Sequence, residues 1–153
     1  MIDRFERFTL AIFHISRYWN KIATDEMKKY GLRGSYALYL LMIAGYEGEL
    51  TAAKLAAVCQ RDKADVSRAM AIFQEKGILE PYKGAKYRAI LKLTEKGTEL
   101  AGQINRRAGI ALQQAGNGLS EEMRENMYQS LDIIAANMRV ISESGLEENS
   151  DKP

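Results

Sequence analysis

The sequence is poor in the residues that build disulfide bonds and metal sites. It has one cysteine, Cys59, and one histidine, His14, among 153 residues. A single cysteine allows no intramolecular disulfide and gives no sign of an oxidising compartment. One histidine far from one cysteine does not match the ligand spacing of a zinc site. We therefore predict no metal and no cofactor, and expect Cys59 to be a core thiol rather than a redox sensor.

Long apolar runs are also missing. The longest, residues 36–44, is about half of the roughly 20 residues that a membrane-spanning helix needs. The first seven residues lack the apolar stretch of a signal peptide. We see no paired carboxylates on a rigid frame, no nucleophile beside a base and no phosphate-binding loop. These absences favour a cytoplasmic protein that is not an enzyme.

Charge is nearly balanced overall but unevenly distributed. The chain has 22 lysines and arginines against 20 acidic residues. Residues 54–96 hold ten basic and five acidic side chains, a local net charge of +5, whereas acidic residues gather near Glu121 and in the tail. A basic middle between less basic flanks is typical of a module that contacts DNA.

Within this basic segment, residues 50–77 have the pattern of a helix-turn-helix. Thr51 and Asp62 are suitable N-caps for two short helices, the second ending at Gly77. At about 100° per residue, one side of the second helix should face the core; it carries Val66, Ala69, Met70 and Phe73. The opposite side carries Ala64, Arg68 and Ala71, with Ser67 on a flank. A second helix that presents a polar face to solvent fits the DNA major groove.

This exposed face provides the first group of candidate DNA-binding residues. Small neighbours around Arg68 would let the backbone approach the groove, so that the arginine reaches guanine O6 and N7 or a phosphate. We expect Asp65 to interact with the helix dipole rather than with a base. The alternative is a solvated helix face with one arginine. The predicted contacts are Arg61, Lys63, Ala64, Ser67 and Arg68.

After Gly77 the pattern changes to strand, turn and strand, which predicts a β-hairpin wing. The strands should cover residues 78–82 and 87–93, with Gly84 in the turn and Pro81 at an edge. Lys83, Lys86 and Arg88 are then candidates for minor-groove or phosphate contacts. A charged edge strand that discourages aggregation is the alternative explanation.

Long helices are expected on both sides of the winged module. Residues 3–29 carry apolar side chains three and four positions apart, as do residues 120–143. Further helices are predicted over residues 35–46 and 94–114, and a disordered tail over 144–153. One chain could pair the two terminal helices internally, but reciprocal pairing between two copies, which would close a two-fold homodimer, is the better interpretation. We therefore assign 1–30 and 98–143 to a dimerisation region and 31–97 to a DNA-binding region.

Several of these motifs together resemble the MarR family of bacterial transcriptional regulators. They are Leu55-Ala56, Val66-Ser67-Arg68, the run from Phe73 to Glu80 (FQEKGILE), and Leu93-Thr94-Glu95-Lys96-Gly97. The family pattern reads "LA … VSR … LEEKGL", then a wing, then "LTEKG". Two departures are Gln60, in a turn where glycine is common, and a short wing without Asp-x-Arg. The resemblance implies a mainly α-helical winged helix-turn-helix with dimerisation helices at both ends.

The resemblance also implies a small-molecule effector, because family members often bind aromatic or anionic compounds between the dimer helices and the winged domain. Aromatic and basic residues of the first two helices are candidates for such a pocket. Packing in the core or in an interface explains them equally well. The candidates are His14, Arg17, Tyr18, Trp19, Tyr36 and Tyr39.

The function predicted from the sequence is therefore a homodimeric DNA-binding transcriptional regulator, expected to be a repressor. Its partner would be double-stranded operator DNA with an inverted repeat, and a small aromatic or anionic effector would release it. The alternative is a winged-helix module that binds proteins and not DNA, since a fold does not fix a function. The basic segment 54–96 favours the DNA-binding hypothesis.

Overall fold

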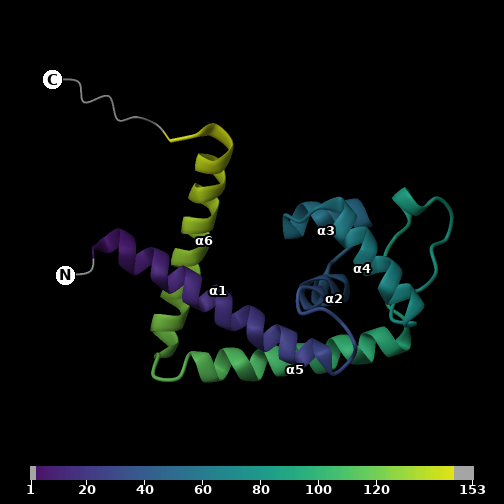
Figure 1. The fold of residues 1–153 in the computed structure, drawn as a ribbon, viewed down its shortest axis with the longest axis horizontal. Coiled ribbons are helices and arrows are strands. Elements are labelled where there is room, and N and C mark those ends of the chain that lie inside the picture. Colours follow the sequence, from purple (N-terminus) through teal and green to yellow (C-terminus); the bar gives the residue numbers. More distant parts are fainter. Residues whose placement is uncertain (1–2, 147–153) are drawn as a thin grey trace. The chain divides into compact units, whose positions relative to one another are not determined.

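The computed structural model describes residues 3–146, and these are mainly helical (Figure 1). The helices are α1 (Arg4–Lys28), α2 (Tyr36–Gly45), α3 (Ala52–Cys59), α4 (Lys63–Glu75), α5 (Glu95–Ala115) and α6 (Glu121–Ser144), with a short 3-10 helix η1 (Lys86–Arg88) between α4 and α5. The chain divides into two compact units, one up to Ile110 and one from Ala111 onward. Within the described range, no helix has the length and apolar character to cross a membrane.

The predicted helix starts are confirmed by their caps. The hydroxyl of Thr51 accepts a hydrogen bond from the backbone N–H of Lys54 at 3.3 Å, and the carboxylate of Asp62 accepts one from Ala64 at 2.6 Å. Ser120 caps α6 in the same way. These side chains satisfy N–H groups that a helix leaves free in its first turn. Of the predicted disordered tail, Ser144 belongs to α6, and residues 147–153 lie outside the described range.

The core of the first unit forms around α2, α3 and α4. The predicted inner face of α4 is confirmed, because the described side chains of Val66, Ala69, Met70 and Phe73 are all 0% exposed. Tyr36 of α2 stacks on Tyr39 with 6.0 Å between ring centroids and meets the edge of Phe73 at 5.9 Å. Aromatic pairs of this geometry add to the free energy gained from burial. The core therefore fixes which face of α4 is turned to solvent.

The predicted β-hairpin is not confirmed. We call residues 78–93 the wing loop; in the described structure it holds two isolated antiparallel bridges, Thr51 with Ile90 and Leu79 with Leu93. Between them lies η1 instead of a second continuous strand. The return segment bonds Leu50 on one side and Glu80 on the other, through the Leu91 N–H at 2.8 Å and the Lys92 carbonyl at 2.8 Å. These bonds point to opposite sides of the return segment, and the pairing in the described structure does not extend beyond isolated bridges.

Helix α5 begins in close contact with the end of α4. Thr94 caps α5 through a hydrogen bond from the Gly97 N–H at 3.0 Å, and its hydroxyl donates to the Gly77 carbonyl at 2.6 Å. Gly97 is buried, and a Cβ at this position would collide with the backbone carbonyl of Ile78. A glycine is therefore required for the close approach of α5.

Further along, α5 is joined to the end of α1 by polar contacts. Arg107 forms a two-pronged ion pair with Glu26, at 3.1 and 2.8 Å, and the Tyr30 hydroxyl donates to Gln103 at 3.0 Å. The Arg107 guanidinium, helped by Lys29, lowers the pKa of Glu26 to about 2. The carboxylate therefore stays ionised and keeps α1 attached to α5 over the usual pH range.

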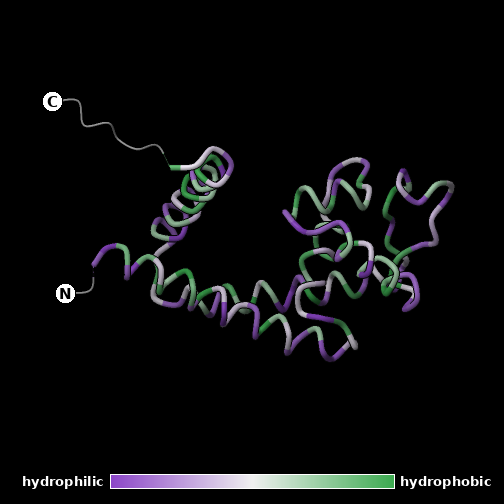
Figure 2. Tube along the Cα trace, turned by 45° about the horizontal axis from the view of Figure 1, so that its top comes forward, coloured by the Kyte–Doolittle hydropathy of each residue, from purple (hydrophilic) through white to green (hydrophobic). Residues whose placement is uncertain are grey.

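Helices α1 and α6 each carry many exposed apolar side chains. Along its 25 residues α1 buries only Met27, and α6 buries no side chain in its range Glu121–Ser144. Hydrophobic positions recur along each helix in Figure 2. Examples are Phe5 at 72% and Ile15 at 67% exposed on α1, and Ile133 at 63% on α6. Exposed apolar surface on this scale is typical of an interaction site.

Replacing Gly97 by alanine should destabilise the protein. The added methyl group collides with the Ile78 carbonyl, so the free energy of unfolding should fall by about 1–3 kcal/mol, as for other overpacked sites. Gly102→Ala in the same helix is the control, since its Cβ would meet only the far end of Arg106 at 3.8 Å. That variant should gain up to about 1 kcal/mol from helix propensity. Equal stability of the two variants in urea unfolding would contradict the packing argument.

Candidate nucleic-acid interface

The candidate interface is centred on the solvent face of α4. Lys63, Ala64 and Arg68 are exposed, as predicted, and Ser67 is half-buried at the flank. The side chain of Arg68 is 62% exposed, because the residues on either side of it are small or point inward. A basic side chain that projects from a rigidly packed helix can enter a groove without rearrangement of the helix.

The turn before α4 keeps the helix-turn-helix geometry although it lacks glycine. Gln60 has φ 49° and ψ 49°, the left-handed conformation, and is the one non-glycine residue with positive φ in the described part of the chain. The next residue closes the turn, because the Arg61 N–H donates to the Ala56 carbonyl at 2.9 Å. The predicted DNA contact Arg61 lies exposed just beyond this turn.

The wing loop brings another of the predicted basic residues to α4. The Lys86 ammonium donates a hydrogen bond to the Ser67 hydroxyl at 3.2 Å, across 19 positions of sequence. Lys63 and Lys86 also line a shallow depression of about 280 Å³, together with Tyr87 and two alanines at the start of α3. Three predicted residues, Lys63, Ser67 and Lys86, are thus brought together.

The other two predicted wing residues, Lys83 and Arg88, line a different depression. Lys92 also lines this depression of about 160 Å³, and Arg88 lies over the Tyr87 ring at 5.2 Å. Tyr87 itself is 70% exposed. A cation held on an exposed aromatic ring is positioned at little cost in solvation. The wing therefore presents its positive charge as two clusters rather than along one strand.

One feature of the site had no signal in the sequence. Asp65, expected to interact only with the helix dipole, accepts a hydrogen bond from the Tyr39 hydroxyl at 2.6 Å and lies 3.5 Å from the Arg68 guanidinium. Tyr39 is a core residue of α2 with 0% exposure. Burial, reinforced by the adjacent carboxylate, raises the pKa of Tyr39 above its ordinary value. No local sequence pattern relates a tyrosine to an aspartate 26 residues away.

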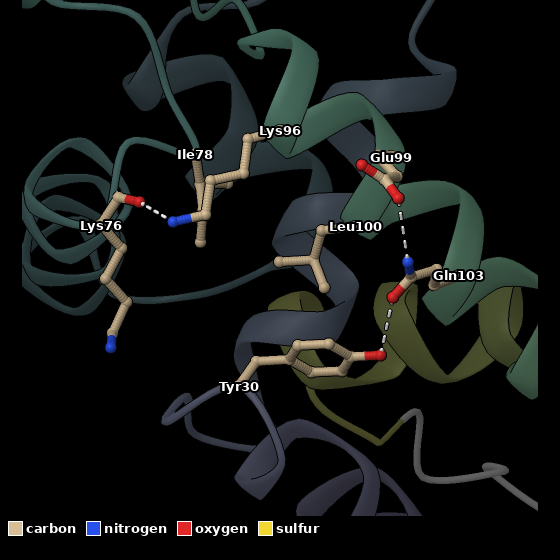
Figure 3. Close-up of a pocket in the computed structure, with 7 residues that line it drawn as sticks. All are labelled: Tyr30, Lys76, Ile78, Lys96, Glu99, Leu100 and Gln103. Carbon is tan, nitrogen blue, oxygen red and sulfur yellow. Dashed lines mark hydrogen bonds between the residues drawn. The ribbon is translucent and has the colours of Figure 1, made fainter.

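The structure does not gather the six predicted effector residues into one cavity. His14, Arg17, Tyr18 and Trp19 are exposed along α1, whereas Tyr36 and Tyr39 are core residues with 1% and 0% exposure. A cavity of about 350 Å³ lies instead between the segment after α1, the end of α4 and the start of α5 (Figure 3). None of the six residues lines it. Its polar groups are bonded to one another: Tyr30 to Gln103, and Lys96 to the Lys76 carbonyl.

Solved structures similar to this one identify the fold. No protein-family model and no curated protein matches the sequence. A MarR family transcriptional regulator from Listeria monocytogenes, complexed with a 26mer DNA, is 23% identical, with a TM-score of 0.77, over 92% of this chain and 97% of that one. A MarR transcriptional regulator from Methanosarcina mazei is 22% identical, with a TM-score of 0.78, over 91% and 93%. The MepR–DNA complex from Staphylococcus aureus is 20% identical, with a TM-score of 0.73, over 86% and 97%.

The fold is that of the MarR family. The likeness extends beyond the winged helix-turn-helix, because it covers nearly the whole of both chains in each pair. The fold predicted from the sequence motifs is thus confirmed, apart from the hairpin. At these identities the likeness concerns the fold, and the assignment of the interface depends on the side chains described above.

Two further observations in this MarR fold concern the predicted core thiol and the possibility of a metal site. Burial raises the pKa of the Cys59 thiol, so the reactive thiolate is disfavoured at neutral pH. Among residues 3–146, no three histidine, cysteine, aspartate or glutamate side chains lie close enough together to hold a metal ion.

Gln60→Gly should stabilise the protein by about 0.5–1 kcal/mol, because glycine adopts the left-handed conformation without a Cβ clash. Ala57→Gly, in the exposed interior of α3, is the control and should cost a similar amount. Urea unfolding of both variants measures the difference. A loss of stability in Gln60→Gly would mean that the glutamine side chain contributes more than its backbone conformation costs.

Proposed function

We propose that this protein is a MarR-type transcriptional regulator that binds operator DNA as a homodimer. The observation that supports the proposal best is the arrangement of basic side chains around one rigid helix. Arg68 projects from α4, and Lys86 of the wing loop reaches Ser67 on the flank of the same helix. In such a site α4 enters the major groove while the wing loop contacts an adjacent groove or backbone.

Charge distribution supports DNA over a protein partner. The ten basic residues of segment 54–96 include every predicted cation of the interface, and the exposed face of α4 carries small side chains around Arg68. An interface for a protein partner is enriched in aromatic side chains at its centre. Here most of the exposed large apolar side chains lie on α1 and α6, and Tyr87 is the exposed aromatic residue of the candidate interface.

The uncovered apolar faces of α1 and α6 support the homodimer. A helix that buries one side chain of 25 gains little stability from packing, although packing of an apolar face supplies most of the stability of helices in proteins. Pairing with a second copy would bury these faces and place two α4 helices on one side of a two-fold axis. The operator is then an inverted repeat with half-sites about 10 bp apart.

Repression and release by an effector are part of the same proposal. A dimer bound to its operator would block transcription, and an effector would favour a dimer in which the two α4 helices are wrongly spaced. The effector can shift this equilibrium only by its differential affinity for the two states. The exposed residues His14, Arg17, Tyr18 and Trp19 of α1 remain its predicted contacts.

Selection from random duplex DNA should enrich an inverted repeat, with the logarithm of affinity falling steeply as the logarithm of salt concentration rises. Arg68→Ala should weaken binding to the selected operator by about 1–3 kcal/mol and relax sequence preference at one base pair in each half-site. Arg106→Ala on α5 removes the same charge from an exposed helix and should have little effect. If no sequence is enriched and binding is weak and salt-sensitive, the protein-interaction alternative is the better one.

Sedimentation should give a species of twice the chain mass of 17.2 kDa. Ile15→Glu places a carboxylate on the exposed apolar face of α1, where Ile15 is 67% exposed, and should yield monomers with weakened operator binding. Lys21→Glu is the control because position 21 lies about 120° around the helix from Ile15, at about 100° per residue. Its loss of the exposed ion pair with Asp25 should cost little. A dimer that survives Ile15→Glu unchanged would exclude this face of α1 from the interface.

A further inference from the structure

Two successive contacts connect the core to the exposed face of α4: Tyr39 of α2 contacts Asp65, and Asp65 contacts Arg68. The two oxygens of the Asp65 carboxylate have different partners. Oδ2 accepts a hydrogen bond from the Tyr39 hydroxyl at 2.6 Å, and Oδ1 lies 3.5 Å from an Arg68 nitrogen. The side chains become more exposed along this series, from 0% for Tyr39 to 27% for Asp65 and 62% for Arg68.

Tyr39, the buried member of this series, is held in place by the core. The Tyr39 ring is fully buried and stacks on Tyr36, which packs against Phe73 of α4. Its hydroxyl keeps its proton at any ordinary pH, since burial and the adjacent carboxylate raise the pKa. A hydrogen bond from a hydroxyl to a carboxylate is short and strong, as the 2.6 Å distance indicates. The Asp65 carboxylate is therefore held by a group that cannot move.

The contact between Asp65 and Arg68 is looser. At 3.5 Å the contact between Arg68 and Asp65 is an ion pair without the geometry of a strong hydrogen bond. A free arginine loses side-chain entropy when it orders on a base, and a carboxylate that limits its conformations beforehand reduces that loss. The same negative charge disfavours a nearby phosphate, so that Arg68 is directed toward a base edge instead.

We propose that Tyr39 and Asp65 are positioning residues that orient Arg68 and so determine specificity at the base pair it reads. This inference rests on the proposed function, because it needs an operator in which Arg68 contacts a base. It gives a core tyrosine of α2 a role in DNA recognition without any contact between that tyrosine and DNA.

Tyr39→Phe tests the inference because it removes only the hydroxyl that holds Asp65. Discrimination at the base pair identified with Arg68→Ala should fall by about 3- to 10-fold, less than the roughly 5- to 150-fold expected when the arginine itself is removed. Affinity for non-operator DNA and its dependence on salt should stay unchanged, because no charge is altered. Tyr36→Phe, in the neighbouring ring of the same stack, is the matched control and should leave discrimination intact.

A double-mutant cycle separates positioning from a general effect on the fold. If Tyr39 acts through Arg68, Tyr39→Phe should cause no further loss in the Arg68→Ala background. A loss of the same size in both backgrounds would overturn the inference in favour of a structural role. Asp65→Asn should relax the same base pair and, because a negative charge is lost, strengthen binding to non-operator DNA.

The inference and the proposed function fail in different ways. Unchanged discrimination in both Tyr39→Phe and Asp65→Asn, with an operator still selected by the native protein, would overturn the inference alone. Failure of the native protein to select any operator would overturn both.

Discussion

The structure depends on the burial of one face of α4 in the core that α2, α3 and α4 share. Val66, Met70 and Phe73 are fully buried there, and each side chain of this size contributes about 1.5–3 kcal/mol on leaving water. Because that face is committed to the core, the opposite face of α4 must point to solvent, and with it Arg68. The direction of the arginine thus follows from hydrophobic packing. The Tyr36–Tyr39 stack belongs to the same core, so any change that moves it also moves Asp65.

Close approaches of backbone and polar side chains then arrange the rest of the first unit around this core. Gly97 lets α5 begin against the Ile78 carbonyl, and Thr94 joins that helix to the end of α4. The wing loop has few hydrogen bonds of its own, and it is held at its base by segments on both sides. Its positive charge is consequently placed by tertiary contacts, such as that of Lys86 with Ser67, more than by a regular strand.

The terminal helices α1 and α6, in contrast to α4, keep most of their apolar side chains in contact with water. In α1 and α6 the apolar stripes that the sequence shows remain exposed, and the core formed around α2, α3 and α4 does not use them. In the proposed function a second copy of the chain supplies the surface that buries these stripes, because it carries the matching stripe by symmetry. In the proposed function one chain folds its DNA-reading core alone and gains stable terminal helices by association.

Local patterns by themselves determined the helices, their caps and the inner face of α4, because these depend on neighbours within about four residues along the chain. The sequence motifs also determined the fold resemblance. The predicted hairpin is not confirmed, because strand pairing depends on segments that meet only in the tertiary structure, and here they pair at isolated bridges. Only the tertiary structure decided that Tyr36 and Tyr39 are core residues and that Tyr39 holds Asp65. The physical reason is that both outcomes depend on groups far apart in sequence that meet only after α2 has packed against α4.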